Sequence, residues 1–259
     1  MDNKIKKNPI IFVGAGPGDP ELITVKGQKA LQKADLVLYA GSLVPEALLT
    51  WANKGATAVN SAPLHLDEIV KCMTDAVKKG KHVVRLHTGD PSLYGAIYEQ
   101  MAELDKQEIS YTVIPGVTAA FAAAAAMKLE YTLPEISQTV ILTRMAGRTP
   151  VPEAENLKRL ASHKASMAIY LSIGLITKVQ KILADHYGED FICAIAVKVS
   201  QPAEKIFYVP VKELSSTVET HHIKSQTLIV VSPSLNTQKN NITYKSKLYD
   251  KEFKHEYRP

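Results

Sequence analysis

The sequence has few cysteines, few aromatic residues and no long apolar run. Its 259 residues include two cysteines and one tryptophan, and aromatic residues make up 7%. Cys72 and Cys193 show no metal-ligand spacing, so we expect buried side chains in a reducing compartment and no protein-bound metal. The longest apolar stretch, residues 117–127, is too short to cross a bilayer, which predicts no membrane partner.

The sequence also lacks a secretory signal, and its central part, residues 8–237, carries no net charge. Residues 1–7 contain neither an apolar core nor a small-residue cleavage site, so we expect a cytoplasmic protein. Of the net charge of +5, residues 1–7 carry +2 and residues 238–259 carry +3, which leaves 8–237 neutral. A nucleic-acid groove needs positive charge on the folded body, so we expect no nucleic-acid partner. Local arginines can still anchor an acidic ligand.

Hydrophobic patterns alternate between strand and helix along the first half of the chain. Helical spacing is present at 22–34, 45–51, 66–79 and 93–104, and β-rich runs lie at 10–13, 36–39, 57–60, 82–86 and 111–114. Strands separated by helices predict a mostly parallel sheet. After Pro115-Gly116, Thr118 can cap an alanine-rich helix.

The second half predicts a mixed sheet with helices. Strands are expected at 139–143, 168–172, 192–199, 205–209 and 227–232, and helices at 153–161 and 175–187. The fold class is therefore α/β, with two α/β domains: residues 1–116 with a mostly parallel sheet and 117–235 with a mixed sheet. Residues 236–259 are polar and charged and are expected to form an extended tail.

A glycine-rich motif follows the first predicted strand. It reads Gly14-Ala15-Gly16-Pro17-Gly18-Asp19-Pro20. A dinucleotide fingerprint needs a third glycine where Asp19 stands, and the two prolines remove amides that would bind phosphate. No Gly-Lys-Ser/Thr follows, which excludes a P-loop. The motif is a rigid turn that a flat ligand can approach closely, although a simple strand-ending turn fits the same residues.

Two further motifs also lie at strand ends. Thr88 to Gly95 follows the fourth strand, and Pro115 to Ala120 follows the fifth. In open α/β sheets, ligands bind at the carboxyl ends of the strands. The three motifs together resemble the tetrapyrrole methylase family in its Val-Gly-x-Gly-Pro-Gly-Asp opening, its Gly-Asp-Pro loop and its Pro-Gly-Val-Thr-Ala segment.

The resemblance covers nearly the whole chain and is closest to the subgroup that methylates precorrin-4 or cobalt-precorrin-4. The segments at 19–27, 39–44, 142–152 and 246–258 carry this closer similarity. It implies transfer of the methyl group of S-adenosylmethionine (SAM) to carbon 11 of the tetrapyrrole during cobalamin synthesis. It also implies a homodimer and an active-site cleft between the domains. Gln201-Pro202-Ala203-Glu204 departs from the subgroup's Trp-Pro-Asp-Glu-like stretch, so the role of this loop stays open.

The resemblance also implies which residues bind the cofactor. Gly89 would let the backbone approach SAM, and Asp90 would accept its hydrogen bonds or orient the loop, although capping the next helix is an equally simple role for Asp90. The whole predicted set is Pro17, Thr88, Gly89, Asp90, Leu93, Thr118, Ala119, Leu171, Val197 and Thr227.

Candidate substrate and catalytic residues are fewer. Arg144 and Arg148 can bind the substrate's carboxylates, because guanidinium groups bind carboxylates bidentately. Ser42 can touch the macrocycle edge. No catalytic base is identified; the candidates Asp90, Tyr39 and His65 also fit core, turn or surface roles. Any cobalt would belong to the substrate.

Other functions fit the same sequence. A related methylase could act on uroporphyrinogen III, another precorrin, ribosomal RNA or diphthine. A protein that binds a tetrapyrrole without turnover is the alternative from a different class.

Overall fold

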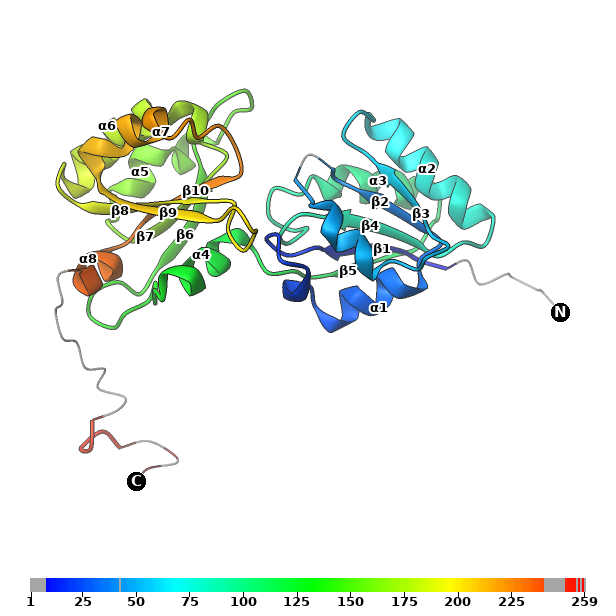
Figure 1. Ribbon diagram of the computed structural model, residues 1–259, viewed down its shortest axis with the longest axis horizontal. Coiled ribbons are helices and arrows are strands. Elements are labelled where there is room, and N and C mark those ends of the chain that lie inside the picture. The colour runs from blue at the N-terminus through cyan, green and yellow to red at the C-terminus, as the bar shows by residue number, and fades with distance from the viewer. Residues whose placement is uncertain (1–7, 42, 240–249, 255, 257, 259) are drawn as a thin grey trace. The chain divides into compact units, whose positions relative to one another are not determined.

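The computed structural model describes residues 8–41, 43–239, 250–254, 256 and 258, and the chain divides into two units (Figure 1). Unit 1 spans Met1–Ala122 and unit 2 spans Ala123–Pro259. The division lies within helix α4 (Ala119–Met127), whereas the sequence analysis places the domain boundary after Gly116.

Unit 1 contains one wholly parallel sheet with the strand order β3-β2-β4-β1-β5. Its strands are β1 (Ile10–Gly14), β2 (Leu36–Tyr39), β3 (Thr57–Asn60), β4 (Val83–His87) and β5 (Tyr111–Ile114). Because β1 pairs with both β4 and β5, the carboxyl ends of these three strands are neighbours at one edge of the sheet. All three glycine-rich motifs start there.

Both faces of this sheet are buried, as parallel sheets require. One core contains Phe12 and Leu38 packed with residues of α2 (Leu66–Lys78) and α3 (Ile97–Lys106). The other contains Val13 and Leu86 packed with residues of α1 (Val25–Lys33) and of the 3₁₀ helix η2 (Glu46–Trp51).

Three helices of unit 1 begin or wind differently from the prediction. The segment 22–34 divides into a 3₁₀ turn, η1 (Pro20–Leu22), and α1, because the Thr24 hydroxyl caps α1 by accepting from the Gly27 amide at 3.1 Å. The segment 45–51 is 3₁₀ rather than α-helical. Helix α3 starts at Ile97 and not near Leu93, because Tyr94 and Ala96 have left-handed backbones that interrupt a helix.

Unit 2 contains a mixed sheet with the strand order β6-β7-β10-β8-β9. Its strands are β6 (Val140–Arg144), β7 (Ser166–Tyr170), β8 (Ile192–Val197), β9 (Lys205–Pro210) and β10 (Thr227–Val231). Only β6 and β7 pair in parallel; the other neighbours are antiparallel. The prediction of an α/β fold with a parallel and a mixed sheet is confirmed.

Figure 1 shows three helices of unit 2 on one face of this sheet and α8 (Pro233–Lys239) on the other. The three are α5 (Leu157–Ala161), α6 (Ile176–Tyr187) and α7 (Leu214–Thr220). Met167, Leu183 and Ile195 are fully buried between these helices and the sheet. Cys193 is also fully buried, and burial raises the pKa of its thiol. In the described ranges, no helix is long and apolar enough to cross a membrane.

Helices α7 and α8 are not expected from the sequence pattern. The extended tail predicted from Asn236 onward is wrong for 236–239, because α8 continues to Lys239. Most of the remaining tail lies outside the described residues. The Asn236 side chain is tied to the first residue of β8: its Oδ1 accepts from the Ile192 amide at 2.9 Å, and its Nδ2 donates to the Ile192 carbonyl at 2.8 Å.

These two hydrogen bonds predict the effect of Asn236→Ala. The change leaves both main-chain groups of Ile192 without their partner, and we expect it to lower the free energy of unfolding by about 1–3 kcal/mol. Urea titration measures the loss. Ser216→Ala, at an exposed position of α7, is the control and should stay within about 0.5 kcal/mol of the parent. Equal effects of the two changes would contradict the assigned role of Asn236.

Candidate functional site: three glycine-lined strand ends and one sheet edge

Three strand ends of unit 1 meet through direct backbone contact. The Gly16 amide donates to the Gly89 carbonyl at 3.2 Å, and the Gly89 amide donates to the Gly16 carbonyl at 2.8 Å. This bridge joins the loop after β1 to the loop after β4. Gly16 and Gly89 have φ angles of +80° and +58°, in the left-handed region that favours glycine.

The third strand end packs against the same place. A Cβ on Gly14 would lie 2.6 Å from the Gly116 Cα and 2.7 Å from the Gly89 carbonyl oxygen. A Cβ on Gly116 would overlap that oxygen as well and would lie 2.8 Å from the Gly14 Cα. No side chain other than hydrogen fits at either position, so the loops after β1, β4 and β5 approach one another as closely as backbones can.

Asp90 fixes two of these loops with one carboxylate. Its Oδ2 accepts from the Gly116 amide at 2.9 Å, and its Oδ1 accepts from the amide of Ser92 at 2.8 Å and from the Ser92 hydroxyl. Burial raises the pKa of Asp90, but these hydrogen bonds outweigh burial, and the net pKa lies below the usual value. The group is therefore an anion with both oxygens engaged.

The predicted catalytic candidates take positions with structural roles. Asp90 orients loops, as described above. Tyr39 is 7% exposed and belongs to the core of unit 1. His65 is exposed and starts α2, with its ring nitrogens 3.8 Å from an Asp67 oxygen and 3.7 Å from a Glu68 oxygen. Ser42, predicted to touch the substrate, lies outside the described residues.

Strand β4, which leads to Thr88 and Gly89, carries two buried polar residues, Arg85 and His87, that the sequence pattern does not assign to the site. Arg85 is 5% exposed and donates to the Gln100 side chain at 3.1 Å, the Ser61 hydroxyl at 2.9 Å and the Leu38 carbonyl at 3.2 Å. Burial lowers the pKa of Arg85 to about 10. An arginine within the otherwise apolar run Val83–Leu86 is the signal that could have identified it.

His87, the last residue of β4, is 4% exposed and stacks on Phe12 with ring centroids 6.0 Å apart. Within the described part of the chain its Nε2 has no hydrogen-bond partner. Burial, with a smaller contribution from the Arg85 charge, lowers the pKa of His87 to about 3. The ring is thus neutral and serves as packing under the loop that carries Thr88 and Gly89.

In unit 2, the strand pairing brings the predicted cofactor residues to one edge of the sheet. Thr227 pairs with Val197 across β10 and β8. Leu171 directly follows β7, whose last residues lie opposite the start of β10. The end of β6, at Arg144, pairs with Tyr170 at the same edge. Leu171 is 65% exposed although it is a leucine, so this edge presents apolar surface.

Backbone strain marks the same edge independently. Leu171, Lys198, Ser200 and Gln226 have φ angles of 52°, 47°, 62° and 50°. Non-glycine residues in this region cost roughly 1–3 kcal/mol each and gather at functional sites. Four other such residues, Glu108, Lys128, Lys164 and His222, lie one to three residues beyond the ends of helices, where a left-handed residue is ordinary.

The two predicted arginine anchors differ in their surroundings. The Arg144 guanidinium donates to the carbonyls of Met145, Thr149 and Pro150 at 3.4, 3.2 and 2.7 Å. These hydrogen bonds hold together the two ends of the loop that follows Arg144. Arg148 lies exposed within that loop.

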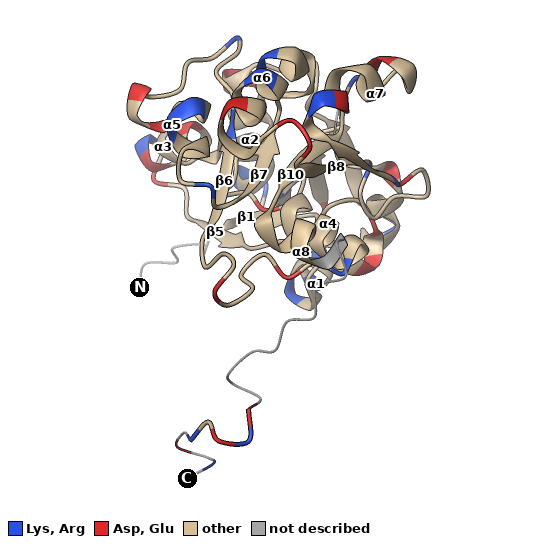
Figure 2. Cartoon of the chain, turned by 90° about the vertical axis from the view of Figure 1, so that its left-hand side faces the viewer, with Lys and Arg blue, Asp and Glu red and all other residues tan. Residues whose placement is uncertain are grey.

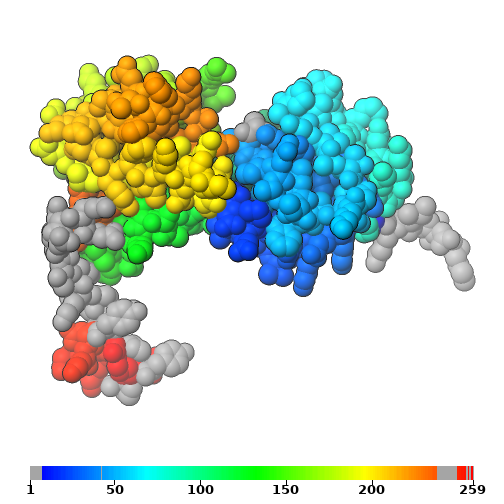
Figure 3. Space-filling view, viewed as in Figure 1, coloured from blue at the N-terminus to red at the C-terminus, as the bar shows by residue number. Residues whose placement is uncertain are grey.

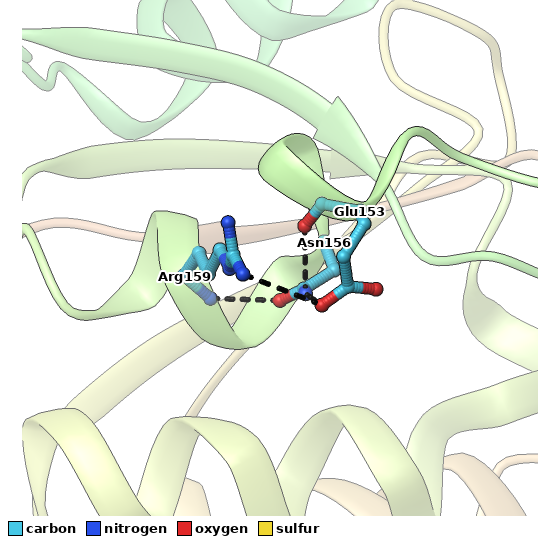
Figure 4. Close-up of polar contacts among 3 residues, drawn as sticks. All are labelled: Glu153, Asn156 and Arg159. Atoms are coloured by element: carbon cyan, nitrogen blue, oxygen red, sulfur yellow. Dashed lines mark hydrogen bonds and ion pairs between the residues drawn. The ribbon is translucent and has the colours of Figure 1, made fainter.

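Figure 4 shows the polar contacts at the start of helix α5, which follows the loop that contains Arg148. The Asn156 side chain caps α5 by accepting from the Arg159 amide at 2.9 Å, and it donates to the Glu153 carboxylate at 2.7 Å. The cap divides the predicted helix 153–161 into a 3₁₀ turn, η3 (Glu153–Glu155), and α5.

Charge on unit 2 is mixed in sign. Helix α5 carries basic residues and α7 carries an acidic one (Figure 2). Among the described residues, no three His, Cys, Asp or Glu side chains gather in a way that could hold a metal ion.

The fold and these strand ends define an α/β protein with a candidate ligand site built on glycine backbone. The family model of the Tetrapyrrole (Corrin/Porphyrin) Methylases matches residues 9–215. The chain therefore belongs to the tetrapyrrole methylase family, and the family predicted from the motifs is confirmed.

Relatives and solved structures agree with this assignment. The chain is 52% identical to the cobalt-precorrin-4 C(11)-methyltransferase of Methanocaldococcus jannaschii, over 100% of this chain and 98% of that protein. The X-ray structure of a cobalt precorrin-4 methyltransferase matches with a TM-score of 0.85 and 47% identity, over 88% and 95% of the two chains. A uroporphyrin-III C-methyltransferase from Thermus thermophilus, complexed with S-adenosylhomocysteine, shares the fold with a TM-score of 0.73 and 22% identity, over 89% and 94%.

The glycine contact predicts that Gly116→Ala damages unit 1. The added Cβ meets backbone atoms on two other loops, which no rotamer change can relieve, so we expect a loss of about 1–3 kcal/mol in the free energy of unfolding. Thermal and urea unfolding measure it. Gly55→Ala is the control, because the nearest atom to its added Cβ is the Asn53 Oδ1 at 3.8 Å. If the free energy of unfolding of Gly116→Ala equals that of the parent, the three loops do not pack as closely as the contact of Gly14, Gly89 and Gly116 requires.

The buried His87 predicts acid sensitivity. Since its folded pKa is about 3 and its ordinary value is 6.5, the unfolded chain binds one more proton between these values. Stability should fall as pH drops from about 6.5 toward 3, with this group contributing up to about 1.4 kcal/mol per pH unit. His87→Leu should reduce the slope of unfolding free energy against pH. An unchanged slope in His87→Leu would refute the assignment.

Proposed function

We propose that this chain is a SAM-dependent methyltransferase that methylates carbon 11 of cobalt-precorrin-4 or precorrin-4 in the construction of the corrin ring. The observation that carries the proposal is the backbone contact of Gly14, Gly89 and Gly116 at three strand ends, in a chain of this family. The names of the relatives supply the substrate, and those names favour the cobalt-bearing form.

The residues present suit an adenosyl ligand. Gly89 has no side chain, so a ligand can closely approach the main chain of the Gly89–Asp90 turn. The exposed Leu171 offers apolar surface for a flat base. The proposed cofactor contacts are Pro17, Thr88, Gly89, Leu93, Thr118 and Ala119 in unit 1, and Leu171, Val197 and Thr227 in unit 2. Asp90 acts by holding the loops after β4 and β5 at a fixed distance.

Bound SAM supplies an activated methyl group on a sulfonium, and the electron-rich macrocycle supplies the carbon nucleophile. The protein's task is then in-line placement, which can supply on the order of 7–11 kcal/mol of barrier reduction. No strong base is needed, consistent with Asp90 having both oxygens engaged and His87 being buried. Arg148 is the proposed anchor for substrate carboxylates, with Arg144 shaping its loop. Cobalt, where present, arrives with the substrate.

The proposal also includes a cytoplasmic homodimer, as the family resemblance implies. Light scattering of the purified protein measures the oligomeric state. A monomer at assay concentrations would remove that part of the proposal and leave the reaction untouched.

The function is tested by methyl transfer from labelled SAM. Cobalt-precorrin-4, metal-free precorrin-4 and uroporphyrinogen III are offered separately, and the products are analysed for the position of the new methyl group. We expect label at carbon 11 of the cobalt-bearing substrate, slower or equal transfer to the metal-free form, and none to uroporphyrinogen III. Transfer to uroporphyrinogen III alone would overturn the substrate. Failure to bind S-adenosylhomocysteine in calorimetry would overturn the reaction class.

A further inference from the structure

The loop between β8 and β9 lies at the end of the unit 2 sheet that carries the proposed cofactor contacts Leu171, Val197 and Thr227. Strand β8 ends at Val197 and β9 begins at Lys205, and these two residues pair with each other. Val197 also pairs with Thr227, a proposed cofactor contact. The loop 198–204 therefore begins and ends beside a residue of the proposed site. Figure 3 shows the segment that contains β9 and α7, yellow to orange, on the exposed surface of unit 2.

Hydrogen bonds tie this loop at four points. The Lys198 amide donates to the Gln226 carbonyl at 2.8 Å, and the Gln201 amide donates to the Lys198 carbonyl at 3.0 Å. The Ser200 amide donates to the Glu204 carboxylate at 2.6 Å, and the Glu204 amide donates to the Gln201 carbonyl at 2.9 Å. Residues 201–204, whose sequence departs from the subgroup, thus belong to a turn fixed by several hydrogen bonds, and the Glu204 carboxylate accepts one of them.

The turn places a lysine in an unfavourable backbone conformation. Lys198 has a φ of 47°, where glycine or asparagine would fold at lower cost. Its side chain is exposed, and no hydrogen bond or ion pair to its ammonium is present among the described residues. The carboxylate of Glu204, the only acid within the loop, already accepts from the Ser200 amide.

We propose that Lys198 is a substrate-binding residue that anchors a carboxylate arm of the tetrapyrrole, positioned by the Glu204–Ser200 hydrogen bond. This inference rests on the proposed function for the identity of the substrate. A lysine ammonium is a compact charge on a long flexible stem, suited to a mobile acetate or propionate group at the rim of a macrocycle. Lys198 complements Arg148, which lies beyond the end of β6 at the same sheet edge.

The test compares tetrapyrrole binding with cofactor binding in the full-length protein. Uroporphyrin, a stable polycarboxylate tetrapyrrole, is titrated with fluorescence detection, and S-adenosylhomocysteine is titrated by calorimetry. Lys198→Gln should weaken uroporphyrin binding about tenfold and raise the KM for cobalt-precorrin-4 by a similar factor, with kcat within about twofold. Lys198→Arg should restore most of the affinity. Lys181→Gln, an exposed lysine of α6, is the charge-matched control.

Two variants of Glu204 test the positioning. Glu204→Gln removes the charge but keeps an oxygen for the Ser200 amide, so it should bind uroporphyrin at least as well as the parent. Glu204→Ala also removes the hydrogen bond and should bind about threefold more weakly than Glu204→Gln. Equal affinities in these two variants would overturn the positioning role.

Several results would overturn the anchor itself. These are parent-like uroporphyrin binding by Lys198→Gln, no restoration by Lys198→Arg, an equal loss of S-adenosylhomocysteine affinity, or a parent protein that binds no polycarboxylate tetrapyrrole. If uroporphyrin binding depends on Lys198 but neither form of precorrin-4 is methylated, the proposed function fails and the anchor stands.

Discussion

The contact of three glycine backbones in unit 1 is the constraint on which the candidate site depends. Gly14, Gly89 and Gly116 come from strands that are neighbours only because β1 pairs with both β4 and β5. The parallel sheet therefore does more than form a core, since it determines which loops can touch. Once they touch, Asp90 connects the second loop to the third, and the surface at their contact is made by main-chain atoms. Such a surface changes little when surrounding side chains vary.

Strand β4, which leads into the central loop, carries a buried arginine, which is unusual for the interior of a small sheet. Arg85 satisfies its guanidinium with a carbonyl, a hydroxyl and an amide oxygen, and the described residues place no carboxylate in hydrogen bond with it. A buried charge without a counterion costs stability unless hydrogen bonds replace its water. The Ser61 hydroxyl that accepts from Arg85 also donates to the Tyr39 carbonyl at 3.0 Å. Arg85 thus links the ends of β2 and β3 to the strand that carries the central loop.

Much of this architecture could be predicted from the sequence, and the failures have physical causes. The strand positions follow from short β-rich runs, and the motifs follow from glycine and proline, whose backbone preferences are strong. The sequence predicts α3 to start too early, because its true start depends on left-handed backbones at Tyr94 and Ala96, which carry no sequence signature. The candidate residues of unit 2 follow from family similarity alone, since the strain at Leu171 and Lys198 appears only in the folded backbone. Helix α8 does not follow from the sequence pattern, because its polar residues resemble a tail, whereas the structure binds Asn236 to β8.

The passage from unit 1 to unit 2 through a continuous helix has a consequence for how this chain can vary in length. Helix α4 buries Ala123 and Met127 on one side while Phe121 and Ala125 stay exposed. One residue inserted in its middle would turn every later position by about 100° around the helix axis and advance it by about 1.5 Å. The buried alanine and methionine would then point elsewhere. Insertions and deletions should therefore be tolerated in exposed loops away from the candidate site, such as 53–55, and excluded from the nine residues of α4.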